Sequence, residues 1–476
     1  PNRLTFTRAL SALDGFALLI SIVIGSGVFS SPGPIDSNVP SPGAALLIWL
    51  LGGTLAWTGA LTLAELGTCF PAEEGGIQPF LTRLYGEVCG FLAAWSWIGA
   101  TMPATLAILS LVFVESVCSA FGWKVGEGGE WGRKVGAIWV LVVVGVLNSV
   151  STKVSTRLGK VFVVVKFATI GLLGVAGLVT VFAFVGSHRR KDWGGRDWHT
   201  RNWFAARDVE VPGGGRIEWS KVGAWESMGY YSAALYAALW AYSGWDKANY
   251  VSAELQNPTK QLPLSINTAI PTIMACYVAA NTVYYVLLPW SVVSTTDAAA
   301  VTAVTHFLGR TASIFATILI CLVILGSALG NSFVAGRMTV AAANKRWLPS
   351  FLGSVGHIGS WRASRQNPGS SAEESDESPI NAIILTHTLS IIYILLGNMR
   401  ILLTFNGLGE YFFFFLTVVG AIKLRFQNPG LHRPIKPFIG VPVLFALIAG
   451  FVVVRGAVFA PVPAVVLAGI WALGLV

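Results

Sequence analysis

An interruption in the first apolar segment constrains this chain more than any other feature. Residues 13–35 are apolar enough to lie in a bilayer, yet Gly25-Ser26-Gly27 falls in the middle of the segment. Glycine weakens a helix by about 1 kcal/mol relative to alanine and tolerates unwound backbone. In hydrocarbon, unwound backbone is stable only where it lines a cavity or is buried in protein. The sequence therefore predicts a helix break at membrane depth. The alternative is that these small residues let two helices pack closely.

The composition is that of a polytopic membrane protein. Hydrophobic residues make up 54% of the chain and charged residues only 12%, whereas soluble domains carry about 25% charged residues. We count about twelve stretches of the roughly 20 apolar residues that a spanning helix needs. The net charge of +9 does not indicate nucleic acid binding, because Lys and Arg are spread over loops. We expect an all-α polytopic membrane protein with about 12 transmembrane helices and no nucleic acid partner.

The expected spans alternate with polar loops. They cover residues 13–35, 44–68, 88–121, 135–150, 158–185, 230–255, 264–288 and 312–343, and four more begin near Ile380, Ile401, Gly440 and Pro461. The longest polar stretches are an outer loop at 187–227 and an acidic, serine-rich insert within 344–378. Lys and Arg near the span ends favour a cytoplasmic N-terminus, although the loop at 187–227 also carries basic residues on the outer side.

A second interruption supports the first. The sixth apolar segment contains Ser243-Gly244, five segments after Gly25-Ser26-Gly27. Paired interruptions in corresponding positions of two halves indicate a transporter site made by inverted repeats. A half-helix that begins at such a break directs its free N–H groups and its positive dipole end toward an anion. Together the two breaks favour a binding site at the membrane midplane.

The residues around both breaks match a known family. Ile24-Gly25-Ser26-Gly27-Val28-Phe29 resembles the first-helix motif of the L-type amino acid transporter family, within the amino acid–polyamine–organocation superfamily. The similarity extends over nearly the whole chain and is greatest to fungal methionine-permease-like members. Its other parts are Ala64-Glu65-Leu66-Gly67, Tyr242-Ser243-Gly244-Trp245, Asn257-Pro258, Gly326-Ser327, and Lys423-Leu424-Arg425 with Arg433-Pro434.

The resemblance implies the leucine-transporter fold. Such a fold has a 5+5 inverted repeat, with helices 1 and 6 broken, plus two extra helices. The first repeat would cover residues 11–186, followed by an extracellular loop at 187–227. The second repeat would cover 228–424, including a cytoplasmic polar insert at 344–378, and helices 11 and 12 would cover 425–476. The resemblance also implies alternating access around a midplane site.

Carried over residue by residue, the resemblance implies how a zwitterionic substrate is held. The substrate carboxylate would meet the backbone N–H groups of Ser26 and Gly27. The amine would meet carbonyls near Val23, Ile24 and Ser243. A broken helix pair also suits a zwitterion on physical grounds, because it offers donors at one end and acceptors at the other.

The same positions limit the size of the substrate. Gly25, Gly27 and Ser243 are small and leave room for a large apolar side chain, so we expect a large neutral amino acid such as methionine. Trp240 matches the family's aromatic gate over the substrate and adds a further carbonyl near the amine, although an ordinary packing or lipid-facing role is the alternative. Gly244 completes the expected substrate contacts at the second break.

Lys166 lies well inside the fifth apolar segment. A lysine in the membrane is costly and by default indicates function, whereas the bland interpretation is a side chain that snorkels from the start of the helix. In sodium-independent relatives, a lysine at this position resembles a built-in substitute for a sodium ion that joins helix 1 to helix 8. The sequence therefore predicts transport without sodium.

Four acidic residues are candidates for coupling or gating. Asp246 and Glu410 stand where relatives have neutral amides, and a buried carboxylate can carry a proton near neutral pH. One of them would couple proton entry to uptake, unless Asp246 simply pairs with Lys247 or another base. Glu65 and Glu254 lie near cytoplasmic ends and are expected to form inner-gate contacts or to be solvated.

The remaining predictions concern partners and alternative classes. Animal relatives link a glycoprotein subunit through a cysteine between helices 3 and 4, but residues 122–134 contain none, which puts a disulfide-linked heavy chain in doubt. No metal-ligand cluster or nucleophile–base pair appears, so we expect no cofactor and no enzymatic activity. We expect an integral protein of the plasma membrane that transports amino acids. The alternative is a receptor that keeps the transporter fold and only binds them.

Overall fold

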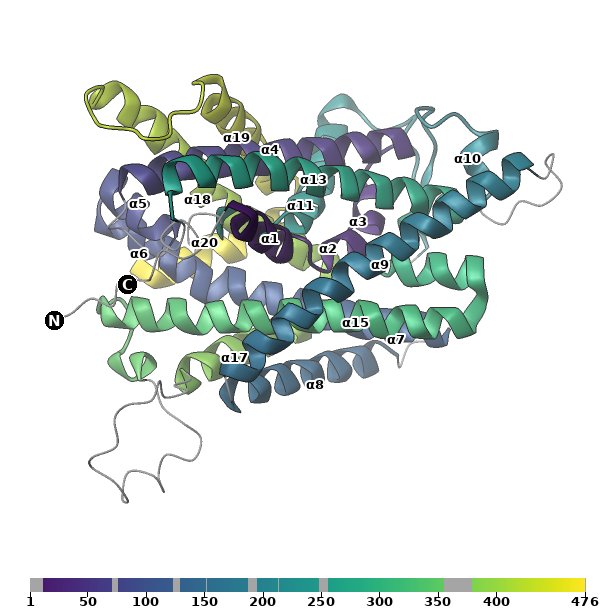
Figure 1. Cartoon of the computed structure of the whole chain (residues 1–476), viewed down its shortest axis with the longest axis horizontal. Helices are drawn as coiled ribbons and strands as arrows, with labels where there is room; N and C mark the ends of the chain where they lie inside the picture. Colours follow the sequence, from purple (N-terminus) through teal and green to yellow (C-terminus); the bar gives the residue numbers. More distant parts are fainter. Residues whose placement is uncertain are drawn as a thin grey trace, which may run out of the picture.

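The part of the chain that the computed structural model describes is almost entirely helical (Figure 1). It comprises residues 12–70, 76–122, 129–150, 152–186, 195–212, 214–247, 256–354 and 379–475. The N-terminal half contains α1 (Ala12–Val23), α2 (Gly27–Ser30), α3 (Pro32–Asp36), α4 (Pro42–Cys69), α5 (Ile77–Tyr85), α6 (Glu87–Ser96), the π-helical turn η1 (Trp97–Thr101), α7 (Met102–Phe121), α8 (Gly129–Val150) and α9 (Thr152–Gly186).

The loop at 187–227, which the sequence predicts to be extracellular and which is called the outer loop below, and the second half follow. They contain α10 (Asp197–Thr200), the antiparallel hairpin β1 (Val209–Val211) and β2 (Gly215–Ile217), α11 (Ala224–Ala241), the 3-10 turn η2 (Trp245–Lys247), α13 (Pro258–Leu287), α14 (Trp290–Thr295), α15 (Ala299–Asn344), the 3-10 turn η4 (Ser350–Gly353), α17 (Ile380–Leu396), α18 (Met399–Gln427), α19 (Gly440–Phe459) and α20 (Pro461–Leu475).

The expected all-α architecture of about twelve membrane segments is confirmed. Seven helices are long and apolar enough to cross a membrane, and three shorter apolar helices lie at 166–182, 380–396 and 461–475. The two remaining segments are the interrupted ones, α1–α3 and α11–η2. Apolar runs of this length can satisfy their backbone groups in a bilayer only as helices.

Two of the long helices, α4 and α18, begin at a residue whose side chain caps the helix. Ser41 precedes α4 and its hydroxyl accepts a hydrogen bond from the amide of Ala44 at 3.2 Å. Asn398 caps α18 in the same way, because its side-chain oxygen accepts from the amide of Ile401 at 3.0 Å. Such caps satisfy amides that have no partner within the helix. They place helix starts a few residues from the positions that hydropathy alone indicates.

Three features depart from a simple set of spans. Residues 97–101 form a π-helical turn within the third span, and π-turns are frequent at functional sites. The eighth span is longer than expected, because α15 continues back across a kink at Gly309, where φ is +83°. The expected sixth span, 230–255, is shorter as a helix, because α11 ends at Ala241 and residues 248–255 lie outside the described part.

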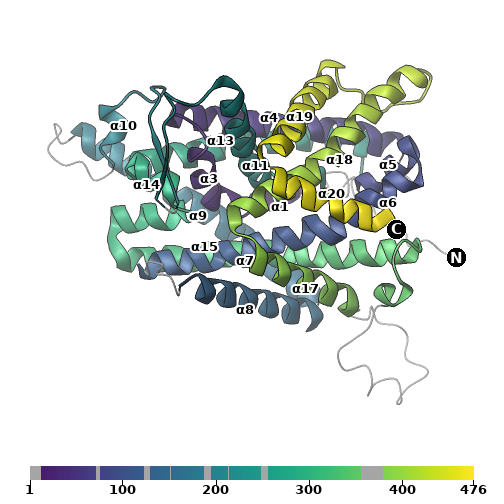
Figure 2. The same ribbon diagram turned by 180° about the vertical axis from the view of Figure 1, so that it is seen from behind.

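The interrupted segment α1–α3 lies inside the helix bundle. Figures 1 and 2 show it between two groups of helices, with α4, α11, α13 and α19 on one side and α7, α8, α15 and α17 on the other. Within these groups α13 packs against α4, and α15 packs against α7. Residues 26–36 are all buried. The first break is therefore enclosed by protein, as unwound backbone at membrane depth requires.

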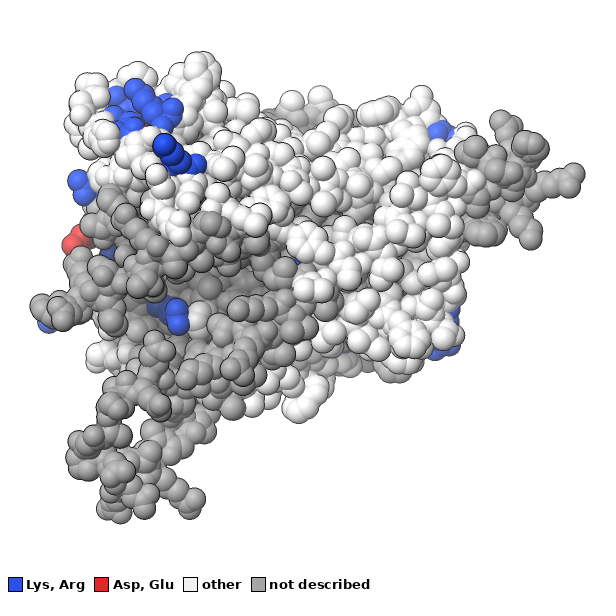
Figure 3. All heavy atoms as spheres, in the orientation of Figure 1, with Lys and Arg blue, Asp and Glu red and all other residues white. Residues whose placement is uncertain are grey.

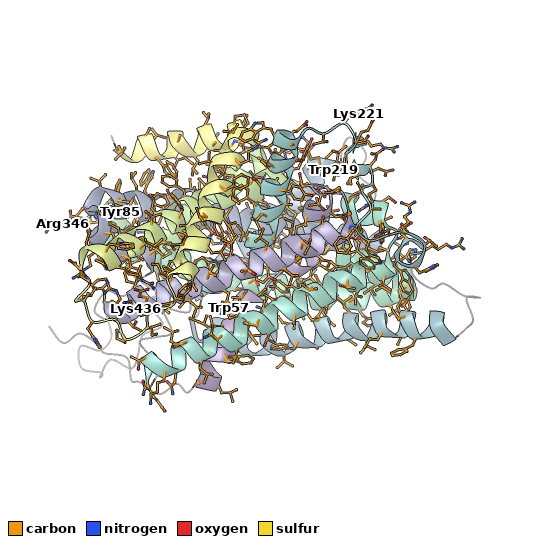
Figure 4. The ribbon with its side chains drawn as sticks, turned by 90° about the horizontal axis from the view of Figure 1, so that it is seen from above. Trp57, Tyr85, Trp219, Lys221, Arg346 and Lys436 are labelled. Atoms are coloured by element: carbon orange, nitrogen blue, oxygen red, sulfur yellow. The ribbon has the colours of Figure 1, made fainter. Side chains whose placement is uncertain are left out.

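Charged side chains lie mainly at the two ends of the molecule. On the face drawn in Figure 3, most described Lys and Arg atoms are at the ends, and the described surface between them is largely uncharged. Figure 4 places Arg346 and Lys436 at one end, while Lys221 of the outer loop is at the opposite end. This pattern matches a protein whose long axis crosses the bilayer, with an uncharged band against lipid.

Candidate functional site

The first break leaves backbone donors without helical partners. Helix α1 ends at Val23 and α2 begins at Gly27. The first intrahelical donor after the break is the amide of Phe29, which bonds the carbonyl of Ser26 at 3.0 Å. The amides of Ser26, Gly27 and Val28 therefore precede the hydrogen-bonded part of the half-helix. This end of the half-helix is electropositive and suits an anion.

A small pocket lies between the two breaks. Its walls come from the break after α1, from the end of α11 and the turn after it, and from α7 and α15. The lining residues are Val23, Gly25, Ser26, Gly27, Thr105, Leu109, Trp240, Ala241, Ser243, Ser327 and Asn331. The cavity volume is about 50 Å³, whereas pockets that hold small molecules are about 300–1,000 Å³. Its walls must therefore separate before a large ligand can enter.

Most of the predicted substrate contacts line this pocket, but two do not. Val23, Gly25, Ser26, Gly27, Trp240 and Ser243 are in its wall. Ile24 and Gly244 are absent from it. Ile24 has a side chain that is 1% exposed, and its amide still bonds the carbonyl of Ile20 at 2.9 Å, so it continues the last turn of α1. Gly244 has φ of +103° and turns the chain away after α11.

Five lining residues were not predicted as contacts from the sequence, and one of them, Ala241, is the last residue of α11. Thr105 and Leu109 are one helical turn apart on α7, and Ser327 and Asn331 are one turn apart on α15. Ser327 was visible only as part of the Gly326-Ser327 motif. Thr105 and Leu109 carry no signal that separates a wall residue from a packing residue.

A buried tyrosine joins the two breaks. The Tyr277 hydroxyl on α13 lies 2.9 Å from the carbonyl oxygen of Val23 and 3.0 Å from that of Ala241. These carbonyls belong to the last turns before the first and second breaks. Tyr277 is fully buried. Its hydroxyl can donate to either carbonyl, so α13 fixes the two broken segments relative to each other.

Gly27 also explains how closely the broken segments approach. A Cβ atom on Gly27 would overlap the backbone and Cβ of Ala241 on α11, whereas one on Gly25 would lie 3.4 Å from Ser327 Oγ. The sequence offered a helix break and close helix packing as alternatives. Both hold in the structure, because the helix is interrupted between Ile24 and Gly27 and the chain then packs tightly at Gly27.

Lys166 is buried near the middle of a long helix. Its side chain is 6% exposed, and it follows the start of α9 by 14 residues, a rise of roughly 21 Å. A side chain at that depth cannot reach the start of the helix by snorkelling. Helix α9 packs against α13 and α15. The role of Lys166 as a substitute for sodium stays a prediction.

The two candidate proton carriers lie near one tyrosine. Asp246 follows Trp245 in the turn η2, and Glu410 is in α18 next to Tyr411. Both carboxylates interact electrostatically with Tyr411, whose hydroxyl lies 3.3 Å from the Trp245 indole nitrogen. Glu410 is 7% exposed. The two acids that the sequence nominated separately thus act on the same tyrosine, and proton coupling stays a prediction.

Glu65 is buried near the end of α4 and held by two arginines. Arg425 Nε lies 2.9 Å from Glu65 Oε1, and its terminal nitrogen contacts Oε2. Arg433 Nε lies 3.2 Å from Oε1. All three side chains are at most 6% exposed, so Glu65 is not a solvated end. Glu254, its predicted companion, lies outside the described residues.

Known proteins match this chain along nearly its whole length. A family model described as amino acid permease matches residues 10–474. The human b(0,+)-type amino acid transporter 1 is 29% identical over 462 residues, which is 97% of this chain and 85% of that protein. The human cystine/glutamate transporter is 27% identical over 452 residues, covering 95% of this chain and 81% of the relative.

A third relative has a different named specificity. The mouse Asc-type amino acid transporter 1 is 26% identical over 453 residues, which is 95% of this chain and 77% of that protein. The similarity therefore spans both breaks and every helix of the pocket, in proteins whose names all specify amino acid, cystine or glutamate transport.

Proposed function

The chain belongs to the amino acid permease family and is a membrane transporter of amino acids, and from this premise we propose that it carries large neutral amino acids such as methionine, without sodium, by alternating access. It is a permease and not an enzyme. Within the superfamily it falls in the L-type group, as its relatives do. The likeness to fungal methionine permeases stays a prediction.

The observation that carries the proposal is the pocket shared by the two breaks. Ser26 and Gly27, whose amides precede the hydrogen-bonded part of the half-helix, line it together with Ser243 of the second break. A free amino acid has an anionic and a cationic end, so it needs donors at one end and acceptors at the other, which the amides of the first break and carbonyls of the second would supply. Backbone groups would hold both charged ends of the substrate, and the substrate's side chain would contact the other residues of the pocket wall.

The rest of the wall supports a neutral side chain. Leu109, Val23 and the indole of Trp240 are apolar, while Thr105, Ser327 and Asn331 are polar but uncharged. No lining residue is ionisable, so this wall has no charge that would select a cationic or anionic side chain. The volume of about 50 Å³ fits a state between the two open ones. Loading and release would widen the pocket on alternate sides.

The buried ionisable groups support the proposed independence from sodium and the proposed coupling to protons. The charge of Lys166 within the bundle would disfavour a bound cation, so no sodium ion is required. Asp246 or Glu410 would carry a proton during uptake. The inverted repeats at 11–186 and 228–424, a cytoplasmic N-terminus and a plasma membrane location complete the proposal.

Radiolabelled methionine uptake into proteoliposomes, in sodium-free buffer, tests the proposal. We expect saturable uptake, competed by large neutral amino acids and not by lysine or glutamate. Accumulation driven by an inward proton gradient supports proton coupling, and Glu410→Gln should then lose the gradient dependence.

Other outcomes divide the proposal into its parts. Uptake only into vesicles preloaded with amino acid means exchange, and proton coupling is then wrong. Strict dependence on sodium contradicts the role given to Lys166. Methionine binding without uptake in any condition favours a receptor that keeps the transporter fold.

A further inference from the structure

The end of the outer half-helix carries a buried carboxylate. Asp36 is the last residue of α3, and its side chain has no exposed surface. Arg207, from the outer loop, places Nη2 2.5 Å from Asp36 Oδ2. The Tyr285 hydroxyl, from the end of α13, donates to Oδ1 at 2.6 Å. A loop and a helix, 171 and 249 residues away in sequence, thus meet on one carboxylate.

The loop that supplies Arg207 is itself attached at several points. The backbone amide of Arg207 bonds the carbonyl of Pro40 at 2.9 Å, and the amide of Gly43 bonds the carbonyl of Trp203 at 2.8 Å. The amide of Trp290 bonds Asp197 Oδ2 at 2.9 Å. Figure 2 shows α3, α10 and α14 gathered at this end of the molecule. The described part of the loop is therefore a fixed part of the outer end.

A second arginine holds the next residue in another way. Arg400, at the start of α18, donates to Ser37 Oγ at 2.6 Å and to Asp297 Oδ1 at 2.7 and 3.0 Å. The side chains of Arg400 and Asp297 are 22% and 25% exposed. The Arg207–Asp36 pair is much less accessible, at 11% and 0%. Loss of Arg207 would therefore leave Asp36 with less water to replace its partner than loss of Arg400 would leave Asp297 and Ser37.

Asp36 is connected to the pocket through the half-helix that it ends. The half-helix from Gly27 to Asp36 comprises α2, Ser31 and α3, ten residues in all, with a rise of roughly 14 Å. It is wholly buried, and the Ser31 hydroxyl donates to the carbonyl of Ala237 on α11 at 2.9 Å. A short, packed rod of this kind transmits displacement of one end to the other. Where Asp36 lies therefore decides where Gly27 and Ser26 lie in the pocket wall.

We propose that Arg207 is a positioning residue for transport: through Asp36 it holds the outer half-helix in the place that closes the pocket, and the outer loop is thereby part of the substrate site. Opening to the outside separates Arg207 from Asp36, and substrate binding favours their contact. The inference rests on the proposed transport function. It names two residues that do not line the pocket: Arg207, in a loop of otherwise unassigned role, and Asp36, at the end of α3.

The test measures KM and Vmax for methionine uptake into proteoliposomes that hold equal amounts of folded protein. Arg207→Gln should raise KM about tenfold, because the closed, binding-competent state is less populated. Asp36→Asn should raise it similarly. The double variant should be no worse than either single variant, since the two residues act through one contact. Arg207→Lys keeps the charge and should recover part of the affinity.

A matched control comes from the same loop. Arg216 pairs with Asp208 at 2.7 Å, but their side chains are 63% and 31% exposed. Arg216→Gln removes the same charge and should leave KM and Vmax unchanged. A purely structural role for Arg207 would lower the amount of folded protein without moving KM.

Three results would overturn the inference. They are a wild-type KM in Arg207→Gln, effects of Arg207→Gln and Asp36→Asn that multiply in the double variant, and an equal effect of Arg216→Gln. Should Arg207→Gln fail to fold, the double variant and Arg207→Lys still decide, because neither leaves a buried carboxylate facing no cation. Failure of the transport proposal is separate, since the wild-type protein would then take up no methionine.

Discussion

The two ends of the molecule each bury a carboxylate, and the partners of these carboxylates differ. At the end that we propose faces outward (the outer end), Asp36 contacts one arginine, Arg207, and one neutral hydroxyl, from Tyr285. The ion pair is balanced in charge. Arg207 comes from a loop and keeps an 11% exposed side chain, so it can exchange the carboxylate for water.

At the opposite end, which we propose faces the cytoplasm (the inner end), Glu65 contacts two arginines. Arg425 is in the last turn of α18, and Arg433 follows in the connection to α19. Arg433 also donates to the carbonyls of Leu424 and Asn428 at 3.0 and 3.1 Å. The cluster has one more positive than negative charge, and none of its three side chains is more than 6% exposed. Water therefore has less access to these side chains than to Arg207.

The difference in partners and exposure indicates which of the two contacts can break during transport. A buried ion pair has a large desolvation cost, so removing one partner is more harmful the less water can replace it. Asp36 ends the ten-residue segment α2–α3 that begins at the pocket, whereas Glu65 lies in the 28-residue helix α4. The outer contact is built to be released, and the inner contact to hold α4 against α18.

The largest effect is expected from Glu65→Gln. It leaves Arg425 and Arg433 buried together without a carboxylate, and breaking a buried pair costs about 3–5 kcal/mol. We expect little folded protein and a strongly lowered thermal midpoint in detergent. Glu218→Gln is the matched control, since Glu218 is 46% exposed in its pair with Lys221. Equal midpoints for the two variants would remove the distinction between the inner cluster and a surface pair.

An intermediate effect is expected from Asp36→Asn. The amide keeps an acceptor for Tyr285 but removes the charge that Arg207 faces, so we expect a loss of about 3 kcal/mol, at the low end for a buried pair. The thermal midpoint should fall less than for Glu65→Gln. A larger fall at Asp36 than at Glu65 would reverse the comparison, and the outer contact could not be the one that releases.

A smaller loss of stability is expected from Tyr285→Phe. The change removes one hydrogen bond to a buried carboxylate, worth about 1.5 kcal/mol at the low end for charged acceptors, and keeps the Arg207 pair. The free energy of unfolding, compared with that of Asp36→Asn in the same detergent, measures it. Tyr285→Phe in the Asp36→Asn background should add little, because the two changes act on one contact. Full additivity would show that Tyr285 stabilises the end by packing alone.

The smallest effect is expected from Arg216→Gln in the β hairpin. Exposed ion pairs contribute about 0–1 kcal/mol, so the thermal midpoint should stay within error of the wild type. The same measurement at low and high salt should give little change for both proteins. A clear destabilisation would mean that the hairpin contributes to the outer end as much as the Arg207 contact does.

Much of the fold could be predicted from the sequence, because long apolar runs have few alternatives in a bilayer. The starts expected near Ile380, Gly440 and Pro461 agree with α17, α19 and α20. The predicted helix boundaries were less accurate where a capping residue or a kink sets the boundary, as the kink at Gly309 does in α15. The breaks were visible because Gly and Ser at membrane depth disfavour a continuous helix.

The contacts between distant residues could not be predicted. Asp36 and Arg207 are 171 residues apart, and Glu65 and Arg425 are 360 apart. Each sequence position shows only an acid or a base, and Lys and Arg are too numerous to assign partners. Tyr277 carried no signal either, because a tyrosine in an apolar span is usually a packing residue.

Protection of a cysteine placed at position 243 tests the central claim, that the amino acid binds between the two breaks. Ser243→Cys protein in proteoliposomes is treated with a small thiol reagent, with and without methionine, and uptake is then measured; wild-type protein, with its five native cysteines, is the control. We predict that the reagent inactivates Ser243→Cys but not the wild type, and that methionine slows inactivation in proportion to its occupancy. Inactivation at the same rate with and without saturating methionine would contradict the account, because the substrate would then bind elsewhere.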